Sequence, residues 1–111
     1  MDTQNCSLDL GHLSQQTMGD ESLQKQVLSI FIQHMETQML LLEAVDADLS
    51  KIAHGIKGSA RGIGAWRVAT AAEALEKTGG DRTTAIRLLK ETIRTTLAEI
   101  ATLLEQGQKA D

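Results

Sequence analysis

The residues of this chain most able to do chemistry lie between Ile52 and Gly64, in the run IAHGIKGSARGIG. Residues three and four positions apart share one face of a helix, so His54, Lys57 and Gly58 would form one surface cluster. A neutral imidazole offers a nucleophilic nitrogen near pH 7, and a lysine one turn away can offset the charge of an anion. The spacing therefore predicts that His54 carries a phosphoryl group for a short time and passes it on.

Gly58 and Ser59 refine this prediction. A glycine inside a helix costs roughly 0.5–1 kcal/mol relative to alanine, so its presence there suggests a steric reason. A side chain at Gly58 would shield the imidazole ring from an approaching partner. Ser59 is expected on the flank, where its hydroxyl can hydrogen-bond locally. Phosphoryl transfer depends mainly on positioning and on charge stabilisation, and these residue types can supply both.

Helices must position this cluster. Hydrophobic residues make up 41 % of the 111 residues, aromatic residues only 2 %, and proline is missing, which favours helix over strand. Apolar residues recur at steps of three and four positions. This pattern predicts a short helix over 7–17 and longer helices over 21–45, 47–63, 65–78 and 82–105.

Aspartates mark the expected starts of three of these helices: Asp20, Asp46 and Asp81 are the predicted N-caps. Amphipathic helices joined by short breaks indicate an all-α fold, an antiparallel up-down four-helix bundle with a short extra N-terminal helix. We expect a single domain over 1–111 with an ordered core at about 8–105.

The helix over 47–63 carries its apolar stripe nearly opposite His54, so the histidine should face solvent or a groove. The turn at Asp46 should bring the preceding helix alongside, with Gln38 near the level of the histidine. The apolar band of that preceding helix covers about half of its circumference, more than an ordinary surface helix needs. Both helices therefore offer candidates for partner docking: Met35, Gln38, Met39, Ser50, Lys51 and Arg61.

The run His54-Gly55-Ile56-Lys57-Gly58-Ser59-Ala60, followed by Gly64 and by Glu73-Ala74-Leu75-Glu76, resembles the histidine-containing phosphotransfer (HPt) domain of bacterial multistep phosphorelays. The helical pattern is similar over most of residues 8–105. The resemblance implies that His54 is phosphorylated, that Lys57 steadies the phosphoryl group and that Gly58 leaves space for the partner.

The same resemblance implies a monomer without kinase activity of its own. It would take a phosphoryl group from a receiver-domain aspartate and give it to another, so its partners would be receiver domains of response regulators and of a hybrid histidine kinase. Mg²⁺ would belong to the receiver, and no cofactor is expected for this chain. Glu76 departs from the family pattern, because some relatives have a glutamine there and an acid would repel phosphate. Glu76, His34 and Cys6 are left without a role.

Two alternatives stay open. The chain could be the phosphorylatable substrate domain of a chemotaxis-type histidine kinase, which has a similar motif and receives its phosphoryl group from ATP. It could also be a helical adaptor that binds receivers without taking phosphate. An enzyme with a substrate pocket is disfavoured, since no second acid–base group accompanies His54 on its helix face.

Composition excludes other classes. A net charge of −4 argues against nucleic-acid binding, and a single cysteine excludes an intramolecular disulfide. The three histidines lack a short metal-ligand spacing, so no metal site is expected. No apolar run reaches the roughly 18 residues of a membrane span, and the first residues do not resemble a signal peptide. A cytoplasmic location is the expectation that follows.

Overall fold

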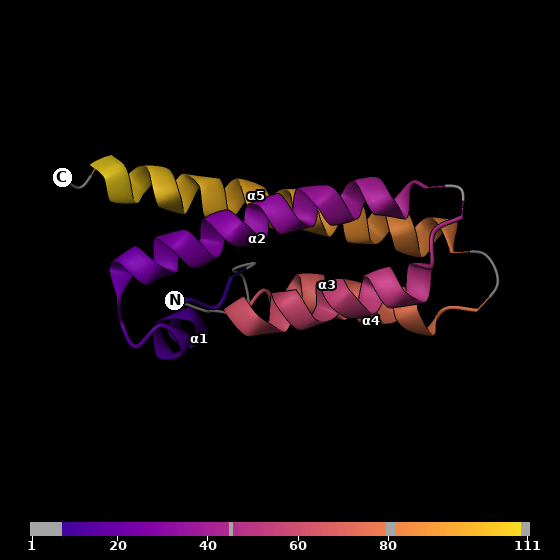
Figure 1. Cartoon of the computed structure of the whole chain (residues 1–111), viewed down its shortest axis with the longest axis horizontal. Helices are drawn as coiled ribbons and strands as arrows, with labels where there is room; N and C mark the ends of the chain where they lie inside the picture. The colour runs from indigo at the N-terminus through magenta and orange to yellow at the C-terminus, as the bar shows by residue number, and fades with distance from the viewer. Residues whose placement is uncertain (1–7, 45, 80–81, 110–111) are drawn as a thin grey trace.

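The computed structural model describes residues 8–44, 46–79 and 82–109, with side chains up to Glu105. Within these ranges the chain is helical and has no strand. The helices are α1 (Leu10–Gln16), α2 (Glu21–Leu42), α3 (Leu49–Ile63), α4 (Trp66–Lys77) and α5 (Thr83–Lys109). Helices α2 to α5 alternate in direction and pack side by side, while α1 lies across one end (Figure 1). The predicted four-helix bundle with a short N-terminal helix is confirmed.

Aspartate side chains cap the N-termini of α2 and α3. The carboxylate of Asp20 accepts a hydrogen bond from the Leu23 N–H at 3.1 Å and caps α2, as predicted. At α3 the predicted cap, Asp46, is wrong: Asp48 accepts from the Lys51 N–H at 3.2 Å, and the helix begins at Leu49. The cap is the aspartate directly before the first residue that packs against the core. Asp81 lies outside the described residues.

Only part of the wide apolar band of α2 faces inward. Ile30 and Leu41 are 65 % and 44 % exposed, whereas Phe31 and Met35 are buried. The apolar band is wide enough that the helix could turn either the Ile30 side or the Met35 side towards the core. The face that packs inward is the one that can contact both α3 and α5, and it carries the aromatic ring and a long flexible methionine. The helix also ends at Leu42, earlier than expected.

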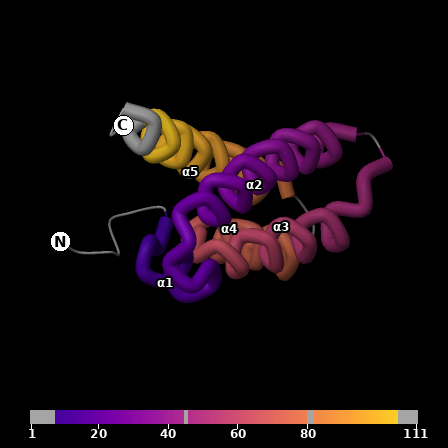
Figure 2. Tube along the Cα trace, turned by 60° about the vertical axis from the view of Figure 1, so that its left-hand side comes forward, coloured from indigo at the N-terminus to yellow at the C-terminus, as the bar shows by residue number. Residues whose placement is uncertain are grey.

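Helix α1 is attached to the turn between α3 and α4, as Figure 2 shows. Gly64 ends α3 in the left-handed region, at φ +84°. Its carbonyl accepts the Asp9 N–H at 2.9 Å, and the Asp9 carboxylate accepts the Trp66 indole N–H at 2.9 Å. The ring of His12 lies 4.9 Å from that of Trp66. These contacts close one end of the bundle and connect α1 to the start of α4.

The predicted N-terminal helix starts later than expected. It begins at Leu10, with Asp9 as its N-cap, and not at Ser7. Leu8 and Leu13 are buried, but Leu10, the first residue of the helix, is half exposed. Leu8 precedes the helix and therefore packs inward from an extended segment, which helical spacing cannot describe.

Helices α3 and α4 form the hairpin that carries the cluster around His54. Alanines on both helices are buried completely, among them Ala53, Ala60 and Ala72. Small side chains on a helix surface let a neighbouring helix approach closely. The outward faces of α3 and α4 therefore lie next to each other and present one continuous surface.

Candidate functional site

The imidazole of His54 stands on the outer face of α3, with 71 % of the side chain exposed. The buried residues of the same helix, Ala53, Ile56, Ala60 and Ile63, lie on the other side. His54 Nδ1 is 2.9 Å from Glu76 Oε2 on α4. An ionised carboxylate only accepts hydrogen bonds, so Nδ1 carries the proton and donates it to Glu76. Nε2 then has a free lone pair, so it is the ring nitrogen that could act as a nucleophile.

The second oxygen of Glu76 is bound as well. Lys57 Nζ donates to Glu76 Oε1 at 2.7 Å, and the Lys57 side chain is only 15 % exposed. The hydrogen bond from Lys57, and after it that from His54, hold the pKa of Glu76 below its ordinary value of 4.5. The carboxylate is therefore ionised at neutral pH, and one side chain of α4 holds two residues of the motif on α3.

Glu76 is the site residue that the sequence analysis missed. Repulsion between an acid and phosphate argued against a role, but the carboxylate lies on the Nδ1 side of the ring and Lys57 offsets its charge. A signal was available in the chain. His54 and Glu76 are equally distant in sequence from Ala65, so an antiparallel hairpin that turns there places them at one level.

Gly58 lies one helical turn after His54, on the same exposed face of α3. A Cβ atom at Gly58 would meet no atom of the described residues within 4 Å. The same holds for Gly55 and Gly62, which also face solvent on α3. Bare backbone therefore adjoins the histidine on the side away from α4, and an approaching partner would meet little steric hindrance there.

Ser59 does not join the histidine. Five positions along a helix correspond to a rotation of about 140°, so Ser59 points to another side of α3 than His54. Its hydroxyl lies 3.1 Å from His34 Nδ1 on α2, and both residues are half-buried. This contact links α2 to α3. It gives His34 a structural position at the rim of the core.

The predicted docking residues divide into buried and exposed ones. Met35 is 0 % exposed, so its assignment to partner docking is wrong: it faces inward on α2 and contacts the core. Gln38 and Met39 are half-buried. The apolar side chains that α2 does expose are others, among them Ile30, Leu40 and Leu41.

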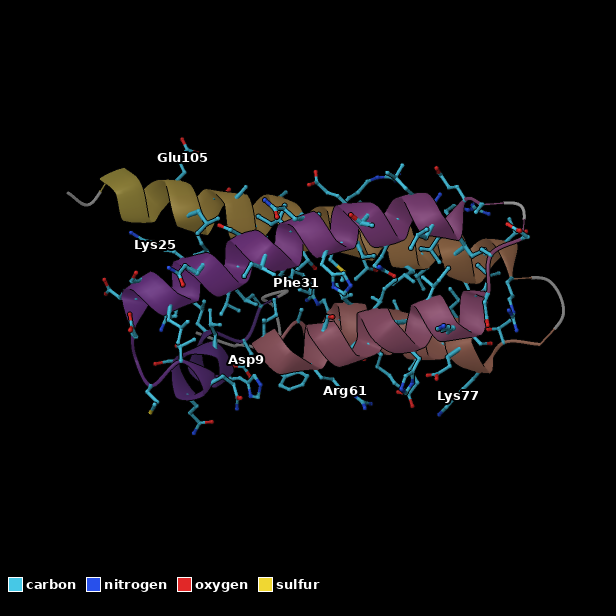
Figure 3. The ribbon with its side chains drawn as sticks, in the orientation of Figure 1. Asp9, Lys25, Phe31, Arg61, Lys77 and Glu105 are labelled. Carbon is cyan, nitrogen blue, oxygen red and sulfur yellow. The ribbon has the colours of Figure 1, made fainter. Side chains whose placement is uncertain are left out.

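The α3 docking candidates surround His54 on its own helix. Lys51 and Arg61 are exposed, and Ser50 is half-buried. Arg61 Nη2 lies 3.8 Å from Glu73 Oε2, and Glu73 also pairs with Lys77. In Figure 3, Arg61 and Lys77 both point to the edge of the molecule away from α2 and α5.

His54 is a surface site. A shallow groove of roughly 400 Å³ lies between α4 and α5, lined by Trp66, Leu88 and their neighbours, and no residue of the His54 cluster lines it. Among the described residues, no group of three or more His, Cys, Asp or Glu side chains could hold a metal ion. In the same residues, no helix combines the length and the apolar character needed to cross a membrane.

In the comparison with known families, the model of the Hpt domain matches residues 26–106. The matched part contains α3 and α4 whole, most of α2 and nearly all of α5. Searches among curated proteins and among solved structures found no match.

Proposed function

The chain belongs to the Hpt domain family, and on this premise we propose that it relays a phosphoryl group between receiver-domain aspartates through a phosphohistidine at His54. Hpt domains are the phosphotransfer domains of phosphorelays. The observation that carries the proposal is the presentation of one exposed imidazole, with Nδ1 bound to Glu76 and Nε2 free.

In the accepting step, the lone pair of Nε2 attacks the phosphorus of an aspartyl phosphate. The N–P bond forms while the P–O bond to the aspartate breaks, and the aspartate leaves as a carboxylate with the electron pair. The ring then carries a positive charge. Its Nδ1–H group keeps the hydrogen bond to Glu76, whose negative charge stabilises the charged ring.

In the donating step, the carboxylate of a second receiver attacks the same phosphorus. The N–P bond breaks and its electron pair returns to Nε2, so His54 leaves as a neutral imidazole. The proton stays on Nδ1 in both directions, because Glu76 accepts its hydrogen bond throughout. The chain needs no further acid or base, which agrees with a carrier that has no kinase activity of its own.

The receiver would dock on the outer face of α3 and the neighbouring part of α2. Open space beyond Gly58 admits the partner to the ring. Lys51 and Arg61 offer positive charge to an acidic receiver surface. On α2, Leu41 contributes exposed apolar area beside the half-buried Gln38 and Met39. We propose that the chain acts as a monomer, since this face must be free for each receiver in turn.

The test is phosphotransfer to His54→Gln. The protein is incubated with a receiver domain carrying labelled phosphate, and acid-labile, base-stable label on the chain is measured. Wild-type protein should gain label, and His54→Gln should gain none while its circular dichroism spectrum stays helical. Label that persists on His54→Gln would contradict the proposal. Incubation with ATP alone should give no label.

A second candidate is a substrate domain fed by ATP through a separate histidine kinase, and the acidic partner of His54 favours it. ATP is a weaker phosphoryl donor than an aspartyl phosphate, so a histidine that receives from ATP gains more from a negative charge beside Nδ1. Rapid labelling by a purified chemotaxis-type kinase core and ATP, with slow labelling by every phosphorylated receiver, would support this candidate over the relay.

A further inference from the structure

Lys57 is already bound where the family resemblance expects it to meet the phosphoryl group. Its Nζ lies 2.7 Å from Glu76 Oε1, and little of its side chain is exposed. A phosphorylated site gains up to about two negative charges. If Lys57 moved to the phosphoryl group, the Glu76 carboxylate would lose its cation beside that added charge. The site therefore needs other positive groups.

The direction of the His54 side chain indicates where these groups should be. Side chains of an α-helix lean towards its N-terminus and cover the preceding turn. For His54 the residues of that turn on the same face are Ser50 and Lys51, four and three positions earlier. Nδ1, next to the attachment point of the ring, is held by Glu76. A group on the distal Nε2 would extend over the turn that contains Ser50 and Lys51.

Two cations lie at this turn. Lys51 is exposed and makes no ion pair with any carboxylate of the described residues. Arg82, from the segment before α5, donates from Nη2 to Ser50 Oγ at 3.5 Å and from Nε to the Thr78 carbonyl at 3.1 Å. Arg82 is thus held beside α3 by contacts with two other parts of the chain. The nearest acid on the same helix, Asp48, accepts the Lys51 backbone N–H as the helix cap.

We propose that the phosphoryl group on His54 is stabilised by the preceding helical turn, through Lys51 and the Ser50–Arg82 pair, while Lys57 serves to hold Glu76. The inference rests on the proposed function, because it assigns the surroundings of the phosphohistidine. It divides the two cationic roles between different residues. Lys57 and Glu76 orient the ring, and Lys51 and Arg82 receive the negative charge.

The experiment uses the full chain phosphorylated with phosphoramidate, which gives its phosphoryl group to histidine and releases ammonia. Label on His54 is defined as the label that His54→Gln lacks. The lifetime of the phosphohistidine is then measured in Lys51→Ala, Arg82→Gln and Lys57→Ala. The control is Lys25→Ala, an exposed lysine near the far end of α2 (Figure 3). A ³¹P NMR titration of each phosphorylated protein reports the charge around the phosphoryl oxygens.

Lys51→Ala and Arg82→Gln should each shorten the lifetime about twofold to fivefold, the range for partly exposed ion pairs. Each should also move the midpoint of the ³¹P titration to higher pH, because a lost cation favours the protonated phosphoryl group. Lys51→Arg and Arg82→Lys, which keep the charge, should restore both values. Lys57→Ala should leave the ³¹P midpoint unchanged and alter the ¹⁵N signals of the His54 ring.

The outcomes separate this inference from the proposed function. If Lys51→Ala and Arg82→Gln behave like Lys25→Ala, and Lys57→Ala alone shortens the lifetime and moves the ³¹P midpoint, the inference is wrong and the relay function stands. If His54 gains no label from phosphoramidate or from a phosphorylated receiver, the inference and the proposed function both fail.

Discussion

At the scale of single residues, one carboxylate decides how the histidine is presented. Glu76 accepts a hydrogen bond from His54 Nδ1 with one oxygen and binds Lys57 with the other. The bond to Nδ1 selects the tautomer, and the ion pair with Lys57 keeps the carboxylate charged. The presentation of the His54 ring on α3 therefore depends on a side chain of α4.

Glu76→Gln should slow phosphoryl uptake from a phosphorylated receiver about threefold to tenfold. Glutamine can still accept the Nδ1–H bond, but a hydrogen bond to a charged acceptor is roughly twice as strong as a neutral one. Single-turnover kinetics measure the effect. Glu73→Gln is the matched control, because Glu73 pairs with Lys77 and Arg61 and not with His54. Equal slowing in both variants would show that general surface charge, and not the contact with the ring, sets the rate.

At the scale of elements, the turn between α3 and α4 requires a glycine at position 64. A Cβ there would lie 3.0 Å from the Asp9 carbonyl oxygen and 3.2 Å from the His12 Cβ, and φ is +84°. Gly64→Ala should therefore destabilise the protein by about 2–4 kcal/mol, from the left-handed backbone and the clash with α1 together. Urea denaturation measures the change.

Gly62→Ala is the control for Gly64→Ala. Gly62 lies within α3, its added Cβ meets nothing within 4 Å, and its backbone is helical. Alanine there should raise stability by about 0.5–1 kcal/mol, because it reduces the freedom of the unfolded chain. Equal losses in the two variants would contradict the assignment of a special conformation to Gly64.

Helix α5 contains a buried hydroxyl without a partner among the described residues, Thr96 Oγ1. The neighbouring Thr92 and Thr95 hydroxyls donate to the carbonyls four positions earlier. Thr96→Val keeps the shape and removes the unpaired group, so the free energy of unfolding should rise by about 1–2 kcal/mol. Thr95→Val, at an exposed position, should change it by less than about 0.5 kcal/mol. A loss of stability in Thr96→Val would mean that the hydroxyl has a partner.

At the scale of the whole molecule, ionised carboxylates connect the helices. Lys57 holds the pKa of Glu76 below its ordinary value, and Lys90 of α5 does the same for Glu43 at the end of α2. The Trp66 indole lowers the pKa of Asp9, which connects α1 to α4. A lowered pKa in the folded state means that the unfolded chain binds protons first as the pH falls.

The protein should therefore lose stability in acid. The contribution of these groups is complete above their ordinary pKa values, 3.8 for Asp9 and 4.5 for the glutamates. It disappears as the pH falls through the lowered values of the folded state. Urea midpoints at pH 7 and pH 3 test this, and Glu43→Gln should show a smaller difference between them than wild type. An unchanged wild-type midpoint would contradict the prediction.

The sequence by itself determined the features that depend on one helix at a time. Periodicity placed the helices, Asp20 marked the start of α2, and the apolar stripe of α3 placed His54 on the exposed side. These features follow from the local geometry of 3.6 residues per turn, which needs no information about neighbouring helices. The family motif could be read for the same reason, because its residues are consecutive on α3.

Only the tertiary structure decided which side of each helix faces its neighbours and which residues of adjacent helices lie opposite each other. It buried Met35 and exposed Ile30, placed Ser59 against His34, and brought Glu76 to the ring of His54. A wide apolar band allows several rotations with similar periodicity, and the packing of all the helices together selects one. The exposed position of His54 could thus be predicted from the sequence, whereas its contact with Glu76 depends on how α4 packs against α3.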